Sequence, residues 1–557
     1  MRRILLPTLA LLTLSAGAQL NIQSGATFFI DAGAVVTVQG DVTSNANITG
    51  TGKLQMKGTA AQNINMNGNT VPNLQIDNNN HVNMTGAATV SGLLEFTAGK
   101  IILGANNLTL GLSSSVAGAQ TGRFAETNGT GEVRRLVNAA GTYVLPVGNG
   151  SNYNPVSINI AGSTFSSAFV GGRARGVAHP NKHPRSTDFL TTYWSLNRSG
   201  VTGGTVTATA TYIDGGGGQV TGTEDPNIRA LTFDGTNWAL GTGQNYAANT
   251  VTANMSTGTS DLYGMNRFLL VNAKALLQGA FDPATGLMRD ALRSTDATQT
   301  GGTPTLTNII PLNDPYRTAD YSGNFIHVNN TVPESIAASV LNHNATAGNN
   351  IVDWVFLQLR SISSATNAPT IQTRSALVQR DGDIVDIDGV SPVYFKDVDA
   401  GNYVIAVRHR NHAGISTNPT APLALGLTPA SFDFTTAAAG NLFGTAGAAY
   451  TQLGAPLRNV MWGGNASGNA IIRFFGSNGP GPQNASDRDA ILADIGGGQS
   501  TIITGQYKKA DVNMNRITRF IGNNGPGVQN TSDRDWLLSQ ALGGAQGNIR
   551  TQSLPGN

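Results

Sequence analysis

The chain has 557 residues, 12% of them charged, a formal net charge of +2 at pH 7, 69 glycines and no cysteine. The lack of cysteine excludes disulfides, thiol catalysis and thiolate metal sites, and the near-neutral charge gives no electrostatic case for binding nucleic acid. Low charge with abundant glycine favours strands and tight turns over helices, and the length suggests three or four domains at about 150 residues each.

The first eighteen residues have the layout of a secretory signal peptide. Two arginines precede an apolar run over 4–14, and small residues at 16–18 provide a cleavage site before Gln19. An uncleaved buried helix is the alternative. No later run reaches the ~18 apolar residues that a membrane span requires. We therefore expect no transmembrane span and a location that is extracellular or on the outer cell surface.

Residues 19–112 are predicted to form a β-solenoid-like region. Short apolar groups are separated by Gly, Asn, Asp and Thr, and apolar residues recur at every second position, the period of a strand with one buried face. Strands broken every eight to twelve positions favour rungs that stack on one another. A β-sandwich is the alternative, because the spacing is not strictly periodic. The alternating pairs are Leu54 with Met56, Leu74 with Ile76, Val82 with Met84, and Leu108 with Leu110.

Two further β-rich domains are predicted. Longer alternating segments with glycine-rich turns over 113–275 indicate an antiparallel β-sandwich. Residues 276–450 contain "DWVFLQLR" and "RSALVQRDGDIVDIDG", in which the "RDGD" sequence indicates a hairpin turn. Their pattern resembles immunoglobulin-like or prealbumin-like sandwiches of exported proteins.

Clusters of chemically active residues are few. His179 and His183 lie in "HPNKHP", where the prolines exclude a regular helix and favour a solvated loop. The aspartates between 381 and 388 could share a hard cation, but the solvated face of a hairpin is the preferred interpretation. His409 and His412 are interpreted as structural, because Arg408 and Arg410 beside them oppose cation binding.

The sequence contains no G-x-S-x-G, H-E-x-x-H or phosphate-loop motif, so no catalytic residue is predicted and the chain is expected not to be an enzyme. A glycosidase needs only two carboxylates brought together by the fold, and a single sequence does not exclude that.

Residues 451–557 contain two copies of one pattern, 46 positions apart. "NGPGPQNASDRDAIL" begins at Asn478 and "NGPGVQNTSDRDWLL" at Asn524. Ser486 and Ser532 are predicted as helix N-caps, each with an aspartate three residues later, and glycines end each helix. This region is therefore predicted to be a small loop–helix repeat module.

The D-x-N-x-N sequence that opens the second copy resembles the calcium loop of dockerin modules, which also occur as paired loop–helix units. The resemblance implies calcium as the cofactor, with early ligands followed by a closing carboxylate from Asp533 or Asp535. Arg516 replaces the usual glycine, and the closing acid comes later than in dockerins. The early ligands implied are Asp511, Asn513 and Asn515.

Two expectations accompany this resemblance. The first copy has no acid at its three early positions, so the second copy should bind calcium better. The alternative is that Asp533 and Asp535 only cap a helix and pair with Arg519 or Arg534.

Taken together, the order of these regions resembles large exported proteins of Gram-negative bacteria that use type IX secretion, often described as hemagglutinin-like. "YVLPVGNGSNYNPV", the "VQRDGDIVDIDG" module with "VRHRNH", and the doubled tail carry this resemblance. The end, "NIRTQSLPGN", departs from it, because it shows no recognisable sorting domain.

The functional expectation is a non-catalytic extracellular or cell-surface protein that acts in adhesion or structure, with a self-assembling filament subunit as one form. Its partners would be other copies of itself, surface proteins or glycans. The alternative is a secreted carbohydrate-active enzyme or a carbohydrate-binding accessory protein with a docking tail.

Overall fold

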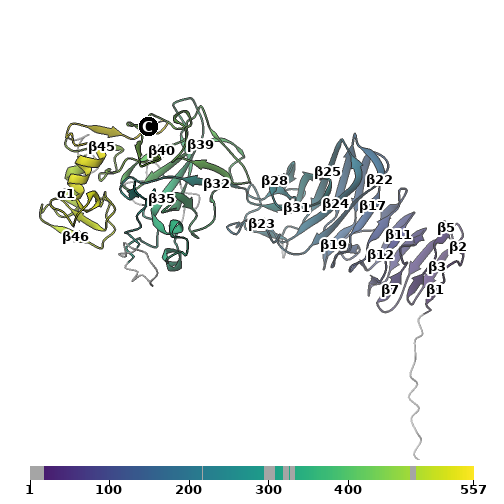
Figure 1. Ribbon diagram of the computed structural model, residues 1–557. Helices are drawn as coiled ribbons and strands as arrows, with labels where there is room; N and C mark the ends of the chain where they lie inside the picture. Colours follow the sequence, from purple (N-terminus) through teal and green to yellow (C-terminus); the bar gives the residue numbers. More distant parts are fainter. Residues whose placement is uncertain are drawn as a thin grey trace, which may run out of the picture. The chain divides into compact units, whose positions relative to one another are not determined.

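The computed structural model describes residues 18–215, 218–293, 308–317, 325–326, 333–476 and 485–556. The predicted signal peptide lies outside them except for Ala18, as do residues 477–484 in the loop of the first tail copy. The chain forms two compact units that meet in sequence at Arg267 and Phe268. It is mainly β, with 44% strand and 6% helix, which confirms the predicted fold class (Figure 1).

The first unit begins as a β-solenoid of about six turns. Three faces of the stack are built from parallel strands that recur about every twenty residues. The first face comprises β1 (Leu20–Ile22), β4 (Val42–Ser44), β7 (Gln62–Asn65), β10 (Val82–Met84), β13 (Ile101–Ile102), β16 (Ala125–Glu126) and β19 (Val147–Asn149). The second comprises β3 (Val35–Val38), β6 (Lys53–Met56), β9 (Asn73–Asp77), β12 (Leu93–Ala98) and β15 (Ser115–Ala117). The third comprises a separate pair, β2 (Phe28–Ile30) with β5 (Ile48–Gly50), followed by the paired series β8 (Thr70–Val71), β11 (Ala88–Val90), β14 (Leu108–Leu110) and β17 (Val133–Leu136).

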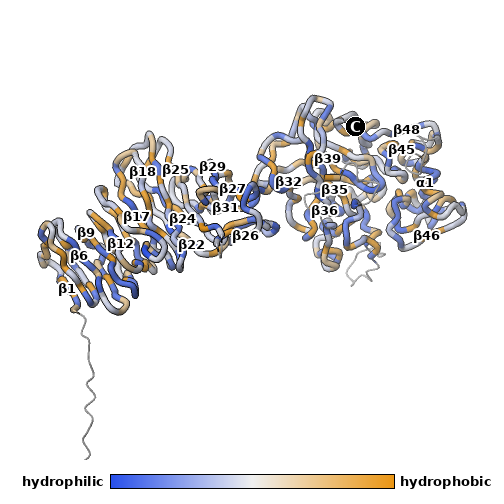
Figure 2. The backbone as a smooth tube through the Cα atoms, turned by 180° about the vertical axis from the view of Figure 1, so that it is seen from behind, coloured by the Kyte–Doolittle hydropathy of each residue, from blue (hydrophilic) through white to orange (hydrophobic). Residues whose placement is uncertain are grey.

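The interior of the solenoid is a set of apolar columns. Leu54, Leu74 and Leu94 are in register on adjacent strands, and all three side chains are 0% exposed. The alternating pairs identified in the sequence are all buried, which confirms the period-two prediction. Hydrophobic and hydrophilic positions alternate along these short strands (Figure 2). Each rung therefore stabilises the next by burying the same columns.

Parallel stacking continues past residue 112 and then changes to antiparallel pairing. β17 pairs antiparallel with β22 (Thr164–Arg175), and β19 pairs antiparallel with β20 (Asn152–Tyr153). The sheet that starts at β22 adds β24 (Tyr193–Thr202), β31 (Gly258–Met265), β23 (Phe189–Leu190), β26 (Val220–Thr221), β27 (Arg229–Phe233) and β28 (Trp238–Leu240). A second antiparallel sheet comprises β18 (Gly141–Leu145), β21 (Val156–Ala161), β25 (Thr205–Thr211), β30 (Thr250–Asn254) and β29 (Gly243–Asn245).

The second unit is built on a nine-stranded sheet. All ten residues of its strand β35 (Ile351–Arg360) are buried, so this strand is covered on both faces. The other strands are β32 (Phe268–Lys274), β36 (Thr370–Gln379), β37 (Asp383–Val385), β38 (Val393–Lys396), β39 (Gly401–His409), β40 (His412–Ser416), β41 (Leu423–Leu425) and β42 (Ala430–Asp433). Two small hairpins are β33 (Phe281–Asp282) with β34 (Leu287–Met288), and β43 (Thr451–Leu453) with β44 (Arg458–Val460).

The tail repeats form the end of this unit. Helices α1 (Asp487–Asp494) and α2 (Asp533–Trp536) begin after Ser486 and Ser532, whose side chains each accept the backbone N–H three residues later. The predicted N-caps are therefore confirmed. The strands are β45 (Ile471–Arg473) with β48 (Ile549–Thr551), and β46 (Ile502–Thr504) with β47 (Ile517–Arg519). In the described part of the chain, no helix is both long and apolar enough to cross a bilayer.

Candidate functional site

The two tail copies share one framework built on a buried aspartate at the start of each helix. In the first copy, Asp487 accepts hydrogen bonds from the backbone and hydroxyl of Ser467 and from the backbone of Arg473, at 2.8–2.9 Å. In the second copy, Asp533 accepts the backbone N–H groups of Val512 and Arg519, each at 2.9 Å. Each aspartate therefore ties the opening loop of its own copy to its helix.

In the second copy a second buried carboxylate, Asp511, lies beside Asp533. Asp511 accepts backbone N–H groups from Asn515 at 3.0 Å and Arg516 at 2.9 Å. Burial raises the pKa of Asp511, and burial together with the negative charge of Asp511 raises the pKa of Asp533 well above its usual range. Two carboxylates in one buried site repel each other, so the pair favours a shared proton or a cation.

Asn513 adds an oxygen to this pair. Its side chain is 0% exposed, its amide nitrogen donates to the carbonyl of Thr531 at 3.0 Å, and its Oδ1 has no hydrogen-bond partner among the described residues. A buried amide oxygen without a donor costs free energy unless something else satisfies it. Asp511, Asn513 and Asp533 carry oxygen atoms, the ligand type that Ca²⁺ prefers, and each carboxylate oxygen of the two aspartates already accepts a backbone N–H.

The other two predicted ligands are placed differently. Asn515 Oδ1 accepts the backbone N–H of Ile517 at 2.9 Å, as Asn469 does for Ile471 in the first copy. Asp535 is partly exposed and pairs with Arg534 at 2.6 Å, so it lies apart from the buried carboxylates. Within the described residues, no three His, Asp or Glu side chains cluster as a metal site, and the oxygen set depends on Asn513.

A half-buried arginine also faces this site. Arg289 Nη2 donates to the carbonyl of Asn513 at 2.8 Å and to Gln529 Oε1 at 2.9 Å. Burial lowers the pKa of Arg289 to about 10, while the charge of Asp511 opposes that shift. At neutral pH the guanidinium remains charged and partly balances Asp511, which weakens the attraction of the site for a cation.

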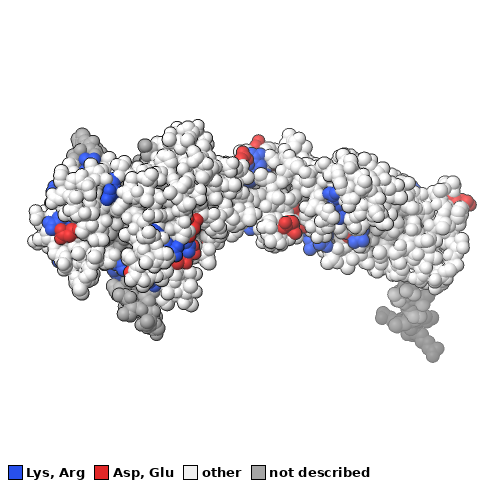
Figure 3. All heavy atoms as spheres, turned by 45° about the horizontal axis from the view of Figure 1, so that its top comes forward, with Lys and Arg blue, Asp and Glu red and all other residues white. Residues whose placement is uncertain are grey.

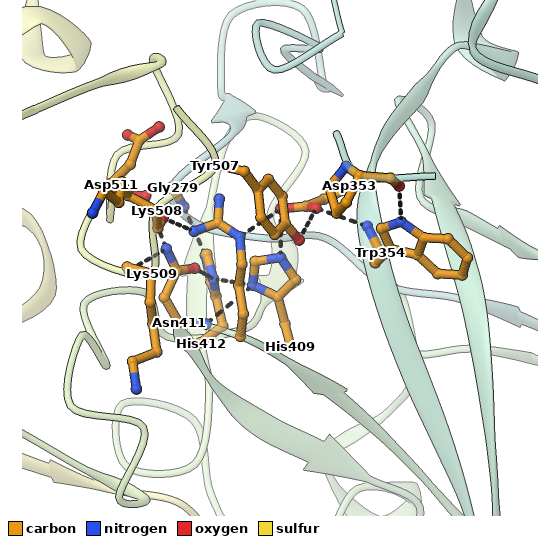
Figure 4. A network of polar contacts seen from close by, with 12 residues as sticks. Gly279, Asp353, Trp354, His409, Asn411, His412, Tyr507, Lys508, Lys509 and Asp511 are labelled. Atoms are coloured by element: carbon orange, nitrogen blue, oxygen red, sulfur yellow. Dashed lines mark hydrogen bonds and ion pairs between the residues drawn. The ribbon is translucent and has the colours of Figure 1, made fainter. Parts of the chain in front are cut away.

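The segment before Asp511 contacts the nine-stranded sheet through a buried polar network centred on Asp353 (Figure 4). One carboxylate oxygen accepts the hydroxyl of Tyr507 at 2.6 Å and the backbone N–H of Trp354 at 2.8 Å. The other lies 3.0 Å from both His409 Nε2 and Arg410 Nε. Burial by itself would raise the pKa of Asp353, but the charge of Arg410 and the bond from His409 outweigh it and hold the pKa below its usual value.

All four ring nitrogens of the two histidines in this network have hydrogen-bond partners within the protein. His412 Nε2 accepts the backbone N–H of Gly279 at 3.0 Å, so its proton is assigned to Nδ1, which lies 2.8 Å from Asn411 Oδ1 and 2.9 Å from His409 Nδ1. His409 then donates from Nε2 to Asp353. Burial lowers the pKa of both imidazoles, that of His412 well below its usual value. Both rings are therefore neutral and bonded within the protein, which supports the interpretation of both histidines as structural.

The turn between β39 and β40 also binds the tail backbone directly. Asn411 Nδ2 donates to the carbonyls of Lys509 at 3.0 Å and Asp511 at 2.8 Å, and Arg410 donates to the carbonyl of Lys508. The backbone at the first predicted calcium ligand is thus held by the central sheet.

Two sequence interpretations require correction. The prediction of a solvated loop is wrong for His179, which is 2% exposed, although its segment is not helical. Its Nε2 lies 3.0 Å from Asp261 Oδ2. The ring is packed among Tyr193, Phe233, Trp238 and Tyr263.

The solvated-hairpin interpretation of residues 381–388 is wrong for Asp386. This side chain is 2% exposed and lies 2.5 Å from Arg374 Nη2, so it belongs to a buried ion pair. Asp383 is nearer the surface, with Lys274 Nζ at 3.1 Å. His179 lies 82 positions from Asp261, and Asp386 lies 12 positions from Arg374. Local sequence patterns do not reveal contacts between such residues.

Comparison of the chain with protein-family models, with curated proteins and with the solved structures finds no match in any of the three.

Proposed function

We propose that the chain is a non-catalytic extracellular or cell-surface protein that acts by adhesion to glycans or surface proteins and by building an extracellular assembly. One observation carries this proposal: the solenoid presents a regular ladder of threonines on its third face. Thr70, Thr89 and Thr109 are paired in register on β8, β11 and β14, and all three side chains are half-buried.

The chemistry of this ladder suits a repetitive polyhydroxyl partner. Neighbouring strands lie about 4.8 Å apart, so the hydroxyl groups recur at that interval. Each hydroxyl can donate one hydrogen bond and accept others, which matches the hydroxyl groups of a polysaccharide. The second face differs, because its threonine hydroxyls bond to neighbouring amides: Thr37 donates to Gln55 at 2.8 Å, and Gln75 donates to Thr97 at 2.8 Å. Charged groups are sparse on the face shown in Figure 3.

Replacing Thr89 by lysine is expected to reduce glycan binding by about tenfold or more, because a bulky cation would interrupt the middle of the ladder. Binding to a glycan array and to insoluble polysaccharides measures the effect. Gln75→Lys, on another face of the same unit, is the matched control and should retain binding.

The same preparations also test the alternative function. Release of reducing sugar by the unmodified chain would establish a carbohydrate-active enzyme instead. Binding of carbohydrate without turnover, lost in Thr89→Lys, is the expected result. If no glycan or surface protein binds, the adhesive part of the proposal is wrong.

We further propose that the second tail copy binds Ca²⁺ through Asp511, Asn513 and Asp533, and that the ion stiffens the module. At a free concentration 100-fold above Kd, the ion would add about 2.7 kcal/mol to the free energy of unfolding. Asp533→Asn is expected to abolish the rise in Tm with Ca²⁺, whereas Asp535→Asn should preserve it. Calorimetric titration shows the heat directly, and no heat in the unmodified protein would contradict calcium binding.

The pH dependence of this effect follows from the raised carboxyl pKa values. Burial raises the pKa of Asp511, and burial together with the charge of Asp511 raises the pKa of Asp533. Without calcium, both carboxyls disfavour the folded state increasingly as the pH rises above the ordinary aspartate pKa of about 4, because folding retains protons that the unfolded chain releases. Calcium requires the ionised form, so its stabilising effect should increase as the pH rises. The calcium-induced shift in Tm is therefore expected to be larger at pH 8 than at pH 5.5.

A further inference from the structure

The first rung of the solenoid has open strand edges. β1, β2 and β3 each pair with only one strand in the described part of the chain, namely β4, β5 and β6. They lie at the purple end of the ribbon in Figure 1. The outer edge of each strand therefore presents backbone N–H and C=O groups that can pair with another strand.

The strands of this rung are three or four residues long, and the rung lacks the lysine, arginine and proline residues that commonly protect an edge. Residues 18–40 contain one charged residue, Asp31, and no lysine, arginine or proline. Exposed edges are normally protected by lysine, proline or a bulge that prevents pairing with another chain. The second rung, by contrast, contains Lys53 and Lys57. An edge without such protection is suited to pairing.

Two exposed apolar side chains lie on the first rung. Phe29 is 62% exposed and Val35 is 52% exposed. The residues in register with them on the next rung are Thr49 and Lys53, which are polar. Apolar side chains therefore accompany the unpaired edges of β2 and β3, whereas the positions in register on the next rung are polar.

The stack can be extended at one end only. At its other end, two of the three faces continue into antiparallel pairs, β17 with β22 and β19 with β20, so no complete parallel rung is open there. A head-to-tail filament needs two complementary ends, whereas a two-fold dimer needs one self-complementary surface. A two-fold axis across the edge reverses strand direction, so the strands would pair antiparallel.

We propose that two copies of this chain join head to head through β1, β2 and β3 and form a closed dimer. The inference rests on the proposed extracellular function, because export would remove the residues before Gln19. In this inference the assembly is a closed dimer with two threonine ladders, not an open filament. Two linked ladders would bind a repetitive surface more tightly than one, through effective concentration.

The test uses the chain from Gln19 to its end, with mass measured by light scattering and sedimentation over a range of concentrations. The expected mass is twice that of one chain. Phe29→Lys combined with Val35→Lys should weaken dimerisation by about 100-fold, since each new charge would meet like charges across the two-fold axis. Both positions are exposed, so the variant should fold normally. Thr49→Lys, in register on the second rung, is the matched control and should remain dimeric.

Three results would overturn the inference: a monomer at every concentration, a mass that grows without limit, or a double variant that stays dimeric. The glycan assay distinguishes failure of the dimer inference from failure of the proposed function. A monomeric wild-type chain that still binds glycans refutes the dimer alone, whereas a dimer without any adhesive partner refutes adhesion alone.

Discussion

Replacing Asp353 by asparagine is expected to lower the free energy of unfolding of the second unit by about 3–5 kcal/mol. The substitution preserves the shape of the side chain but removes the charge that balances Arg410, which is itself buried. It also weakens the bonds from His409 and Tyr507. An uncompensated buried cation is one of the costliest defects in a protein core.

Denaturant unfolding, followed by the fluorescence of tryptophans in the second unit, measures this loss. Asp381→Asn is the control, because Asp381 is partly exposed and its ion pair with Lys274 is long, at 3.7 Å. A surface pair of this kind contributes about 0–1 kcal/mol. Equal losses in both variants would show that the buried network does not hold this unit together.

Replacing Leu74 by alanine is expected to destabilise the first unit by about 2–5 kcal/mol. Leu74 is fully buried between Leu54 and Leu94, so truncation would leave a cavity in the middle of the column. Rungs on either side depend on this contact, because stability in a solenoid is the sum of interfaces between neighbours.

The control for this variant is Gln75→Ala, the adjacent residue on the outer face. It should change the free energy of unfolding by about 0.5 kcal/mol or less. The two units are expected to give separate transitions, so Leu74→Ala should shift only the transition of the first. A small effect of Leu74→Ala would mean that the column can collapse around the gap.

Much of the first unit could be predicted because its contacts repeat at short range. Inward residues such as Leu54 and Met56 alternate with polar ones, and the same pattern recurs one rung later at Leu74 and Ile76. A period of two identifies the buried face without knowledge of any partner. The repeat also identified the two helix caps in the tail.

The candidate site was only partly predictable, because its decisive contacts join distant residues. Asp353 and Tyr507 are 154 positions apart, and nothing in either local sequence indicates their hydrogen bond. The D-x-N-x-N pattern identified Asp511 and Asn513, but it could not distinguish Asp533 from Asp535. Helix geometry makes that distinction, since Asp533 begins the helix facing the loop while Asp535 pairs with Arg534 near the surface.

The pairing of β45 with β48 determines when the tail can fold. Ile471 is in register with Thr551, so the strand that opens the first copy is completed by residues that are synthesised after both helices. The first copy therefore cannot pair its opening strand until the residues after the second helix have been synthesised, so the two copies close together rather than one after the other.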